Sequence, residues 1–348
     1  MRKNLNLLLA FAVCALCAPG VQAGTPESAA FIDRGRSLFD FGRWTDARHE
    51  FLQARETLSP ADREAAQTVD FYLAACAVEL GSRDAEGFTR AFMTTDAFPK
   101  FASITVPLSG GTVRLTGMAK GAGMICPNMA TMLAFYTTDA AVSPALLEKA
   151  LKTVVPGTYN QMSVDLDTST NDTLIIMASG LAGNPEITEE NADYDAFVAA
   201  LTAIAEHMCA EHAGDGEGAT HLITCEVTHA PDLKTARAVS RSVVCSNLFK
   251  AAVFGRDANW GRILCAIGYT PGDFSIDKVS VRIASKAGEV FVCENAAYHP
   301  FSEDEAYAVL GEHDILVKVD MGTGEASGKA WGCDLTYDYV KINGDYRT

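Results

Sequence analysis

The sequence is short of basic residues. It has 28 Lys and Arg against 44 Asp and Glu, its formal net charge is -16, and no Lys/Arg cluster reverses that sign locally. A negative field of this size repels phosphate backbones and the headgroups of anionic lipids. We therefore expect no nucleic-acid partner.

The sequence also has no apolar run long enough to span a bilayer. The apolar stretch at residues 5–18 follows Arg2 and Lys3 and is too short for a membrane span. A small-residue cleavage pattern then follows at residues 21–23. This form is typical of a signal peptide and predicts a leader over residues 1–23 and export, for example to the periplasm. The alternative is an N-terminal helix that packs normally.

The cysteines show no disulfide framework. Two of the ten, Cys14 and Cys17, lie in the leader, and the other eight are scattered singly, several within apolar runs, as at Cys265 and Cys293. Scattered cysteines in apolar runs are typical of reduced, buried thiols in a cytosolic protein. The group at 207–212 (His207, Cys209 and His212) does not place all three side chains on one helix face, so no metal site is predicted.

With 48% apolar and 21% charged residues the chain is globular, and its length suits two or three domains.

A helical arm is predicted over residues 24–88. In the arm, small residues at Gly35 and Ala47 allow two helices to approach, and Phe51 fills the gap between them. This pattern resembles a tetratricopeptide (TPR) helix-turn-helix and predicts a protein partner, although two plain amphipathic helices are the alternative.

From about residue 89 the pattern changes to short β-rich runs, glycine-rich turns and interleaved helices, which predicts a layered α/β domain over residues 89–348. Helices are predicted after Ser143-Pro144, a good N-cap followed by proline in the first turn, and from about Tyr194 to Gly214. Strands are predicted at residues 112–116, 173–178, 221–227, 279–284 and 315–319.

The central motif of this region runs from Gly117 to Phe135. A glycine-rich turn surrounds Lys120, and Thr131 leads into an apolar strand. The motif has neither the residue order nor the following helix of a phosphate-binding loop. Taken as a pattern alone, Lys120 is most often a solvated loop charge and Thr131 a strand former.

Longer ordered motifs resemble the ornithine acetyltransferase (ArgJ type) family over about residues 89–348. They are Thr94-Thr95-Asp96-Ala-Phe-Pro-Lys100, Met118-Ala-Lys120-Gly-Ala-Gly-Met-Ile, Pro127-Asn-Met-Ala130-Thr131-Met-Leu, Val164-Asp165-Leu-Asp167, Glu217-Gly-Ala-Thr220, Asn259-Trp260-Gly-Arg262 and the ending Asp334 to Thr348. The resemblance implies an α/β fold with an N-terminal nucleophile.

The resemblance also implies the chemistry. In this family the chain cuts itself between the residues that match Ala130 and Thr131, and the new N-terminal threonine becomes the nucleophile. The α-amine of such a residue has an unperturbed pKa of ~7.7 to 8.0 and can take the hydroxyl proton. The implied reaction moves acetyl from N2-acetyl-L-ornithine to L-glutamate in arginine biosynthesis, with acetyl-CoA as a further donor in bifunctional members and no bound cofactor.

The same resemblance implies binding residues and partners. Residues matching the family's substrate-binding positions are Thr95, Lys120, Thr131, Glu217, Asn343 and Thr348. The two cleavage fragments are expected to remain together in a heterotetramer-like assembly, in the cytoplasm. The family's oxyanion-hole Thr-Gly pair lies in an N-terminal portion that this sequence does not match, so the oxyanion hole is unassigned.

The leader supports a second hypothesis from a different class. An exported TPR-like interaction protein would carry an acetyltransferase-derived domain that is incomplete and inactive. Self-cleavage distinguishes the two, because a binding module has no reason to cut itself before Thr131.

Overall fold

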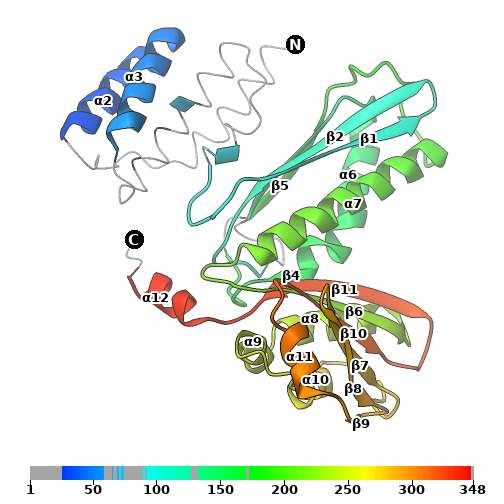
Figure 1. Cartoon of the computed structure of the whole chain (residues 1–348). Helices are drawn as coiled ribbons and strands as arrows, with labels where there is room; N and C mark the ends of the chain where they lie inside the picture. The colour runs from blue at the N-terminus through cyan, green and yellow to red at the C-terminus, as the bar shows by residue number, and fades with distance from the viewer. Residues whose placement is uncertain are drawn as a thin grey trace. The chain divides into compact units, whose positions relative to one another are not determined.

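The computed structural model describes residues 26–58, 65, 69, 72–73, 89–90, 92–126, 132–169 and 172–345. The predicted leader and most of the second half of the predicted arm lie outside these residues. The chain divides into two compact units, Met1–Pro99 and Lys100–Thr348, and each is described by itself (Figure 1). No helix within the described ranges is long and apolar enough to cross a membrane.

The first unit contains a helix-turn-helix. Helix α2 (Pro26–Asp40) and helix α3 (Trp44–Thr57) are joined by a turn in which Gly42 has a φ of +74°. A Cβ atom at Gly35 would lie 2.6 Å from the ring of Phe51, and Phe51 is fully buried and stacks on Tyr72. The helix pair and its close approach at Gly35 are therefore as predicted. The TPR class of the arm and its partner stay predictions.

The second unit begins with a four-stranded sheet of order β1-β2-β3-β5. Its strands are β1 (Lys100–Leu108), β2 (Gly111–Lys120), β3 (Leu133–Thr138) and β5 (Thr173–Ala178). The first three pair antiparallel, and β3 pairs parallel with β5. Two helices accompany this sheet, α6 (Pro144–Val154) and the long α7 (Ala192–Gly214). Buried side chains of α7, among them Phe197 and Leu201, pack with Leu115 and Tyr136 of the sheet.

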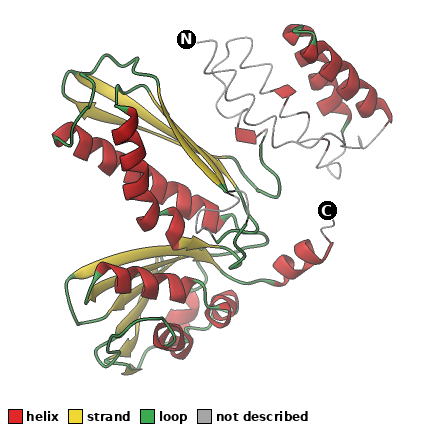
Figure 2. Ribbon diagram, turned by 180° about the vertical axis from the view of Figure 1, so that it is seen from behind, coloured by secondary structure: helices red, strands yellow, loops and turns green. Residues whose placement is uncertain are grey.

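A seven-stranded sheet of order β4-β11-β6-β10-β7-β8-β9 forms the rest of the unit. Its strands are β4 (Met162–Ser163), β6 (Leu222–Ala230), β7 (Ser280–Ser285), β8 (Gly288–Glu294), β9 (Ala297–Tyr298), β10 (Asp314–Asp320) and β11 (Ala326–Cys333). Helices α8 (Leu233–Val244), α9 (Asn247–Phe254), α10 (Trp260–Gly268) and α11 (Glu303–Val309) accompany it (Figure 2).

Helix α7 lies between the two sheets, because it contacts β1 and β2 of the first and β6 and β11 of the second. Short 3-10 turns at Val155–Gly157 and Tyr159–Gln161 connect α6 to β4. The last described element is α12 (Tyr337–Asp345), which follows β11 directly. The end of β2, the region around β4, the end of α7 and α12 therefore belong to the part of the unit where the two sheets meet.

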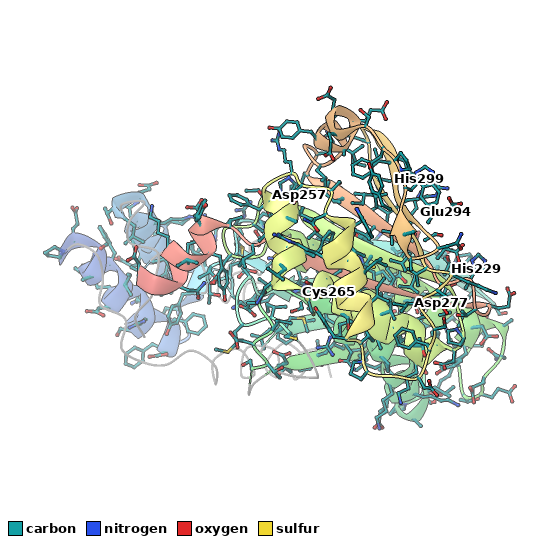
Figure 3. The ribbon with its side chains drawn as sticks, turned by 90° about the horizontal axis from the view of Figure 1, so that it is seen from below. His229, Asp257, Cys265, Asp277, Glu294 and His299 are labelled. Carbon is teal, nitrogen blue, oxygen red and sulfur yellow. The ribbon has the colours of Figure 1, made fainter. Side chains whose placement is uncertain are left out.

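All five predicted strands and both predicted helices are present in the second unit. Two details differ from expectation. Ser143 stands at the N-cap of α6 but its side chain makes no capping hydrogen bond. Cys265 is exposed on α10 rather than buried, because the apolar run around it is an amphipathic helix whose buried face is formed by Ile263, Ala266 and Ile267 (Figure 3). Cys293 is buried, as predicted.

Candidate active site

A sharp turn at residues 121–126 follows β2 and forms the base of the candidate site. Gly121 has a φ of +140°, and Met124 has a φ of +55°, which a residue with a side chain rarely adopts. A Cβ atom at Gly121 would lie 2.8 Å from the side chain of Ile125. The glycine-rich composition of the motif is thus needed for a turn that is both tight and left-handed in places.

Glu217 lies directly on this turn. Its backbone N–H donates to the carbonyl oxygen of Ala122 at 2.9 Å, and its carboxyl group would lie 2.5 Å from a Cβ atom at Gly123. The Nδ2 atom of Asn343 donates to Glu217 Oε2 at 2.8 Å and to the carbonyl oxygen of Tyr339 at 3.1 Å. Because that nitrogen carries two protons, both are used, and Asn343 Oδ1 remains an acceptor beside the carboxylate.

Asp165 also fixes the turn at residues 121–126. Its two carboxylate oxygens accept the backbone N–H groups of Met124 at 2.7 Å and Ile125 at 3.0 Å, and Tyr339 Oη donates to it at 3.4 Å. Burial raises the pKa of Asp165 above its ordinary value, and these backbone hydrogen bonds partly oppose the rise. Asp165 therefore connects the turn to α12.

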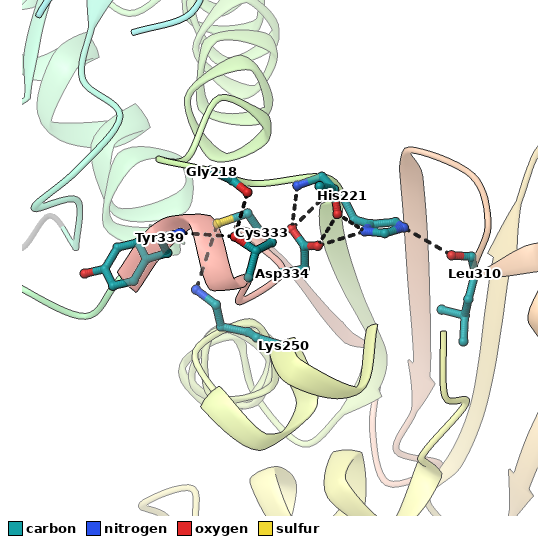
Figure 4. A network of polar contacts seen from close by, with 9 residues as sticks. Gly218, His221, Lys250, Leu310, Cys333, Asp334 and Tyr339 are labelled. Carbon is teal, nitrogen blue, oxygen red and sulfur yellow. Dashed lines mark hydrogen bonds and ion pairs between the residues drawn. The ribbon is translucent and has the colours of Figure 1, made fainter. Parts of the chain in front are cut away.

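A second polar network holds the chain entering α12 (Figure 4). The backbone N–H groups of Thr220 and His221 donate to Asp334 Oδ1 at 2.8 and 3.0 Å, and the Thr220 hydroxyl donates to Asp334 Oδ2 at 2.5 Å. His221 Nδ1 lies 2.9 Å from Asp334 Oδ2, and His221 Nε2 lies 3.2 Å from the carbonyl oxygen of Leu310. Burial works against ionisation of Asp334, but the hydrogen bonds from His221 and Thr220 outweigh it and lower the pKa.

This network is structural rather than nucleophilic. The Thr220 hydroxyl donates to Asp334 and also lies 2.8 Å from His221 Nδ1, and the other ring nitrogen of His221 faces the backbone carbonyl of Leu310, so these side chains connect segments of the chain to one another. Its effect is to anchor the end of β11 on the segment after α7. Thr336 adds to this anchor, because its hydroxyl donates to the carbonyl oxygen of Gly218 at 2.7 Å.

Lys250 also contacts this region. It is 2% exposed on α9 (Figure 4), and its Nζ donates to the carbonyl oxygen of Val164, the residue before Asp165. The thiol of Cys333 lies 3.9 Å from the same nitrogen, and burial raises the pKa of that thiol to about 11. We call residues 121–126, 163–167, 215–221 and 334–343 the site segments.

The structure brings two of the predicted site residues into direct contact, Glu217 and Asn343. Lys120 is the last residue of β2 and pairs in register with Leu133, the second residue after Thr131 in the chain.

Thr95 lies in a bend of the first unit and is half-buried there. The other predicted site residues, Ala130, Thr131 and Thr348, lie outside the described residues.

Several residues that shape the site were not singled out from the sequence. Asp165 was visible only as part of a motif, and nothing local indicated that its carboxylate accepts two consecutive backbone N–H groups. The Thr220–His221–Asp334 network joins residues more than 110 positions apart. Within the described ranges, no group of three or more His, Cys, Asp or Glu residues could hold a metal ion.

Known proteins are similar to this chain in sequence. The family model described as ArgJ matches residues 61–348, which begins before the predicted domain boundary at 89. The arginine biosynthesis bifunctional protein ArgJ of Caldanaerobacter subterraneus subsp. tengcongensis is 49% identical over 272 residues, 78% of this chain and 68% of that protein. The protein of the same name from Geobacillus kaustophilus is 48% identical over 265 residues, 76% of this chain and 64% of that protein.

A solved structure agrees in fold. The crystal structure of arginine biosynthesis bifunctional protein ArgJ from Bacillus halodurans matches with a TM-score of 0.59 and 44% identity, covering 62% of this chain and 100% of that one. The chain spans about two thirds of the length of the curated relatives it matches. The protein thus has a layered α/β fold in which a glycine-rich turn lies against the carboxylate of Glu217. The chain belongs to the ArgJ family, as its sequence motifs indicated.

Proposed function

We propose that this protein is an acetyltransferase of arginine biosynthesis, which moves acetyl from N2-acetyl-L-ornithine to L-glutamate through an acetyl-Thr131 intermediate. In this proposal Thr131 is released by self-cleavage after Ala130. The names of the relatives, which refer to a bifunctional protein of arginine biosynthesis, support the pathway. Acetyl-CoA is a second acetyl donor in the bifunctional form of the reaction.

The observation that carries the proposal is the contact between Glu217 and Asn343 above Gly123. A carboxylate with an amide oxygen beside it offers two acceptors, which suit the ammonium group of an amino acid substrate. Lys120, at the end of β2, supplies a cation for a substrate carboxylate. Thr95 and Thr348 complete the proposed set of substrate-binding residues.

The proposed chemistry needs no histidine. The α-amine of Thr131 takes the proton of its own hydroxyl, and the hydroxyl oxygen attacks the acetyl carbonyl of the donor. Ornithine then leaves, and the acetyl group remains as an ester on Thr131. The amine of glutamate attacks that ester in the second half of a ping-pong cycle, and the threonine hydroxyl is restored.

Strand pairing supports a two-chain product. Cleavage between Ala130 and Thr131 would place β2 in the first fragment and β3 in the second. These strands form a continuous antiparallel ladder from Leu115, paired with Thr138, to Lys120, paired with Leu133. The ladder and the packing of α7 on β1 and β2 would hold the fragments together after the cut.

Acetyl transfer by variants at position 131 tests the proposal. Thr131→Ala should lower transfer from N2-acetylornithine to labelled glutamate by at least about 10³-fold, because the nucleophile is removed. Thr131→Ser is the matched control, since it keeps a hydroxyl and should retain measurable cleavage and transfer. Appreciable transfer by folded Thr131→Ala would overturn the assigned nucleophile, and an uncut, inactive wild-type chain would favour the binding-protein hypothesis.

A further inference from the structure

A buried ion pair lies beside the site segments and has no role in the chemistry proposed so far. Lys100, the first residue of β1, has a fully buried side chain, and its Nζ lies 2.5 Å from Asp215 Oδ2, whose side chain is 4% exposed. Removing two charges from water is costly, and two apolar side chains of similar size are often at least as stable in such a place. Stability alone therefore does not account for a charged pair at this position.

Lys100 lies at the end of the four-stranded sheet where the glycine-rich turn begins. It pairs in register with Ala119, the residue before Lys120 at the end of β2. The turn that follows β2 contains Ala122, whose carbonyl oxygen accepts the backbone N–H of Glu217 at 2.9 Å. The strand pair of β1 and β2 thus connects Lys100 to the turn on which Glu217 lies.

Asp215 approaches Glu217 from the other side, along the chain. It is the C-cap of α7, and its backbone N–H donates to the carbonyl oxygen of Glu211 at 3.1 Å. The next residue is closely packed, because a Cβ atom at Gly216 would lie 2.7 Å from Cys333 Sγ. Only this closely packed residue separates Asp215 from Glu217, so a shift of Asp215 would be passed on to Glu217.

We propose that Lys100 and Asp215 are positioning residues for Glu217. Their ion pair closes a ring of contacts that runs from β1 through β2 and the turn to Glu217 and back to Asp215. It fixes the end of α7 against β1 and so holds the Glu217 carboxylate at Gly123. The inference rests on the proposed function, in which Glu217 binds the ammonium group of the amino acid substrate.

Steady-state kinetics and urea titration together test the pair. Lys100→Met should raise the KM for the amino acid substrate by about 10- to 100-fold, with a much smaller change in kcat, because Glu217 binds substrate and does not react. This variant should also have a lower urea midpoint, since the Asp215 charge loses its buried cation. The double variant Lys100→Met/Asp215→Asn buries neither charge, so it should regain much of the midpoint but keep the high KM.

Val281→Ala is the matched control for stability. Val281 is fully buried in the seven-stranded sheet, and its truncation should lower the urea midpoint and leave the KM unchanged. The inference is wrong if the double variant regains the KM of an active wild type together with its stability, because the pair would then be structural only.

Hydrogen–deuterium exchange of the full chain gives a readout that does not depend on acetyl transfer. In the double variant the peptide that covers residues 215–221 should exchange at least about tenfold faster than in wild type, while the peptide that covers β7 should be unchanged. If wild type transfers no acetyl group, the proposed function fails, but this comparison still decides whether the pair holds the Glu217 segment. Equal exchange of residues 215–221 in both proteins would overturn the inference whatever the activity.

Discussion

The seven-stranded sheet and the site segments are held together by different kinds of contact. The sheet and its helices bury a continuous apolar cluster that includes Phe249, Val281 and Ile283. The site segments instead place carboxylates in close contact with backbone N–H groups and a side-chain amide, and they contain residues with a positive φ, such as Met124 and Leu166. Stability in this protein is therefore concentrated where packing is apolar, and the polar contacts of the site segments fix geometry.

The difference also explains how the site segments are held. Asp165 and Asp334 each accept several hydrogen bonds from a distant part of the sequence. Asp165 joins the turn to α12, and Asp334 joins the end of β11 to the segment after α7. Because a buried polar group is costly only when it lacks a partner, such networks hold these segments together at little net cost in stability.

The largest effect on stability is expected in the sheet core. Phe249→Ala removes a fully buried side chain from α9 and should cost about 3–5 kcal/mol in the free energy of unfolding. Leu248→Ala is the matched control, because the neighbouring side chain is 61% exposed and its loss should cost less than about 0.5 kcal/mol. Urea titration measures both, and equal losses would contradict the assignment of the core.

Gly123→Ala should separate geometry from stability. The added Cβ atom would lie 2.5 Å from the Glu217 carboxyl group, which must move away from the turn. We expect acetyl transfer to fall by about 10²-fold, since displacement of a binding group by about 1 Å has effects of this size. Gly111→Ala, where nothing lies within 4 Å, is the control and should keep its activity. A normal rate in Gly123→Ala would remove Glu217 from the proposed site.

Asp334→Asn should weaken the network at the end of β11 by about 1–3 kcal/mol near pH 7. The folded pKa of Asp334 is lowered, so its contribution is present above the unfolded value of about 3.9 and is lost as the pH falls through the folded value. The stability difference between wild type and variant should therefore shrink as the pH falls below about 4. Urea titrations at several pH values check this, and a difference that grows at low pH would contradict it.

Asn343→Ala should give the smallest effect. The variant loses the exposed 2.8 Å hydrogen bond that Asn343 Nδ2 donates to Glu217 Oε2. The loss of one such hydrogen bond corresponds to about 0.5–1.5 kcal/mol. We expect this loss to appear as a several-fold rise in the KM for the amino acid substrate, with little change in unfolding. Lys341→Ala, on the exposed surface of the same helix, is the control. An unchanged KM would show that Asn343 does not position the carboxylate.

Local patterns predicted most of the secondary structure of the second unit, because alternating strands and amphipathic helices are properties of short segments. The same reasoning misplaced Cys265, since an apolar run does not reveal which face of a short helix is turned outward. It also gave Ser143 a capping role that its side chain does not perform.

The site was predictable only through family motifs. Glu217 and Asn343 are 126 positions apart, and no periodicity in the sequence indicates that they meet. The roles of Asp165 and Asp334 depend on backbone N–H groups, which every segment carries and which no sequence pattern distinguishes. Contacts of this kind follow from the arrangement of the two sheets rather than from any local preference.

Intact-mass spectrometry of the purified protein, with N-terminal sequencing of each chain, shows directly whether Thr131 becomes the nucleophile. We expect two associated chains, the second beginning Thr131-Met132-Leu133, and an acetyl group on that chain alone after brief incubation with N2-acetylornithine. A folded protein that remains a single uncut chain, or that carries the acetyl group on the other fragment, would contradict it.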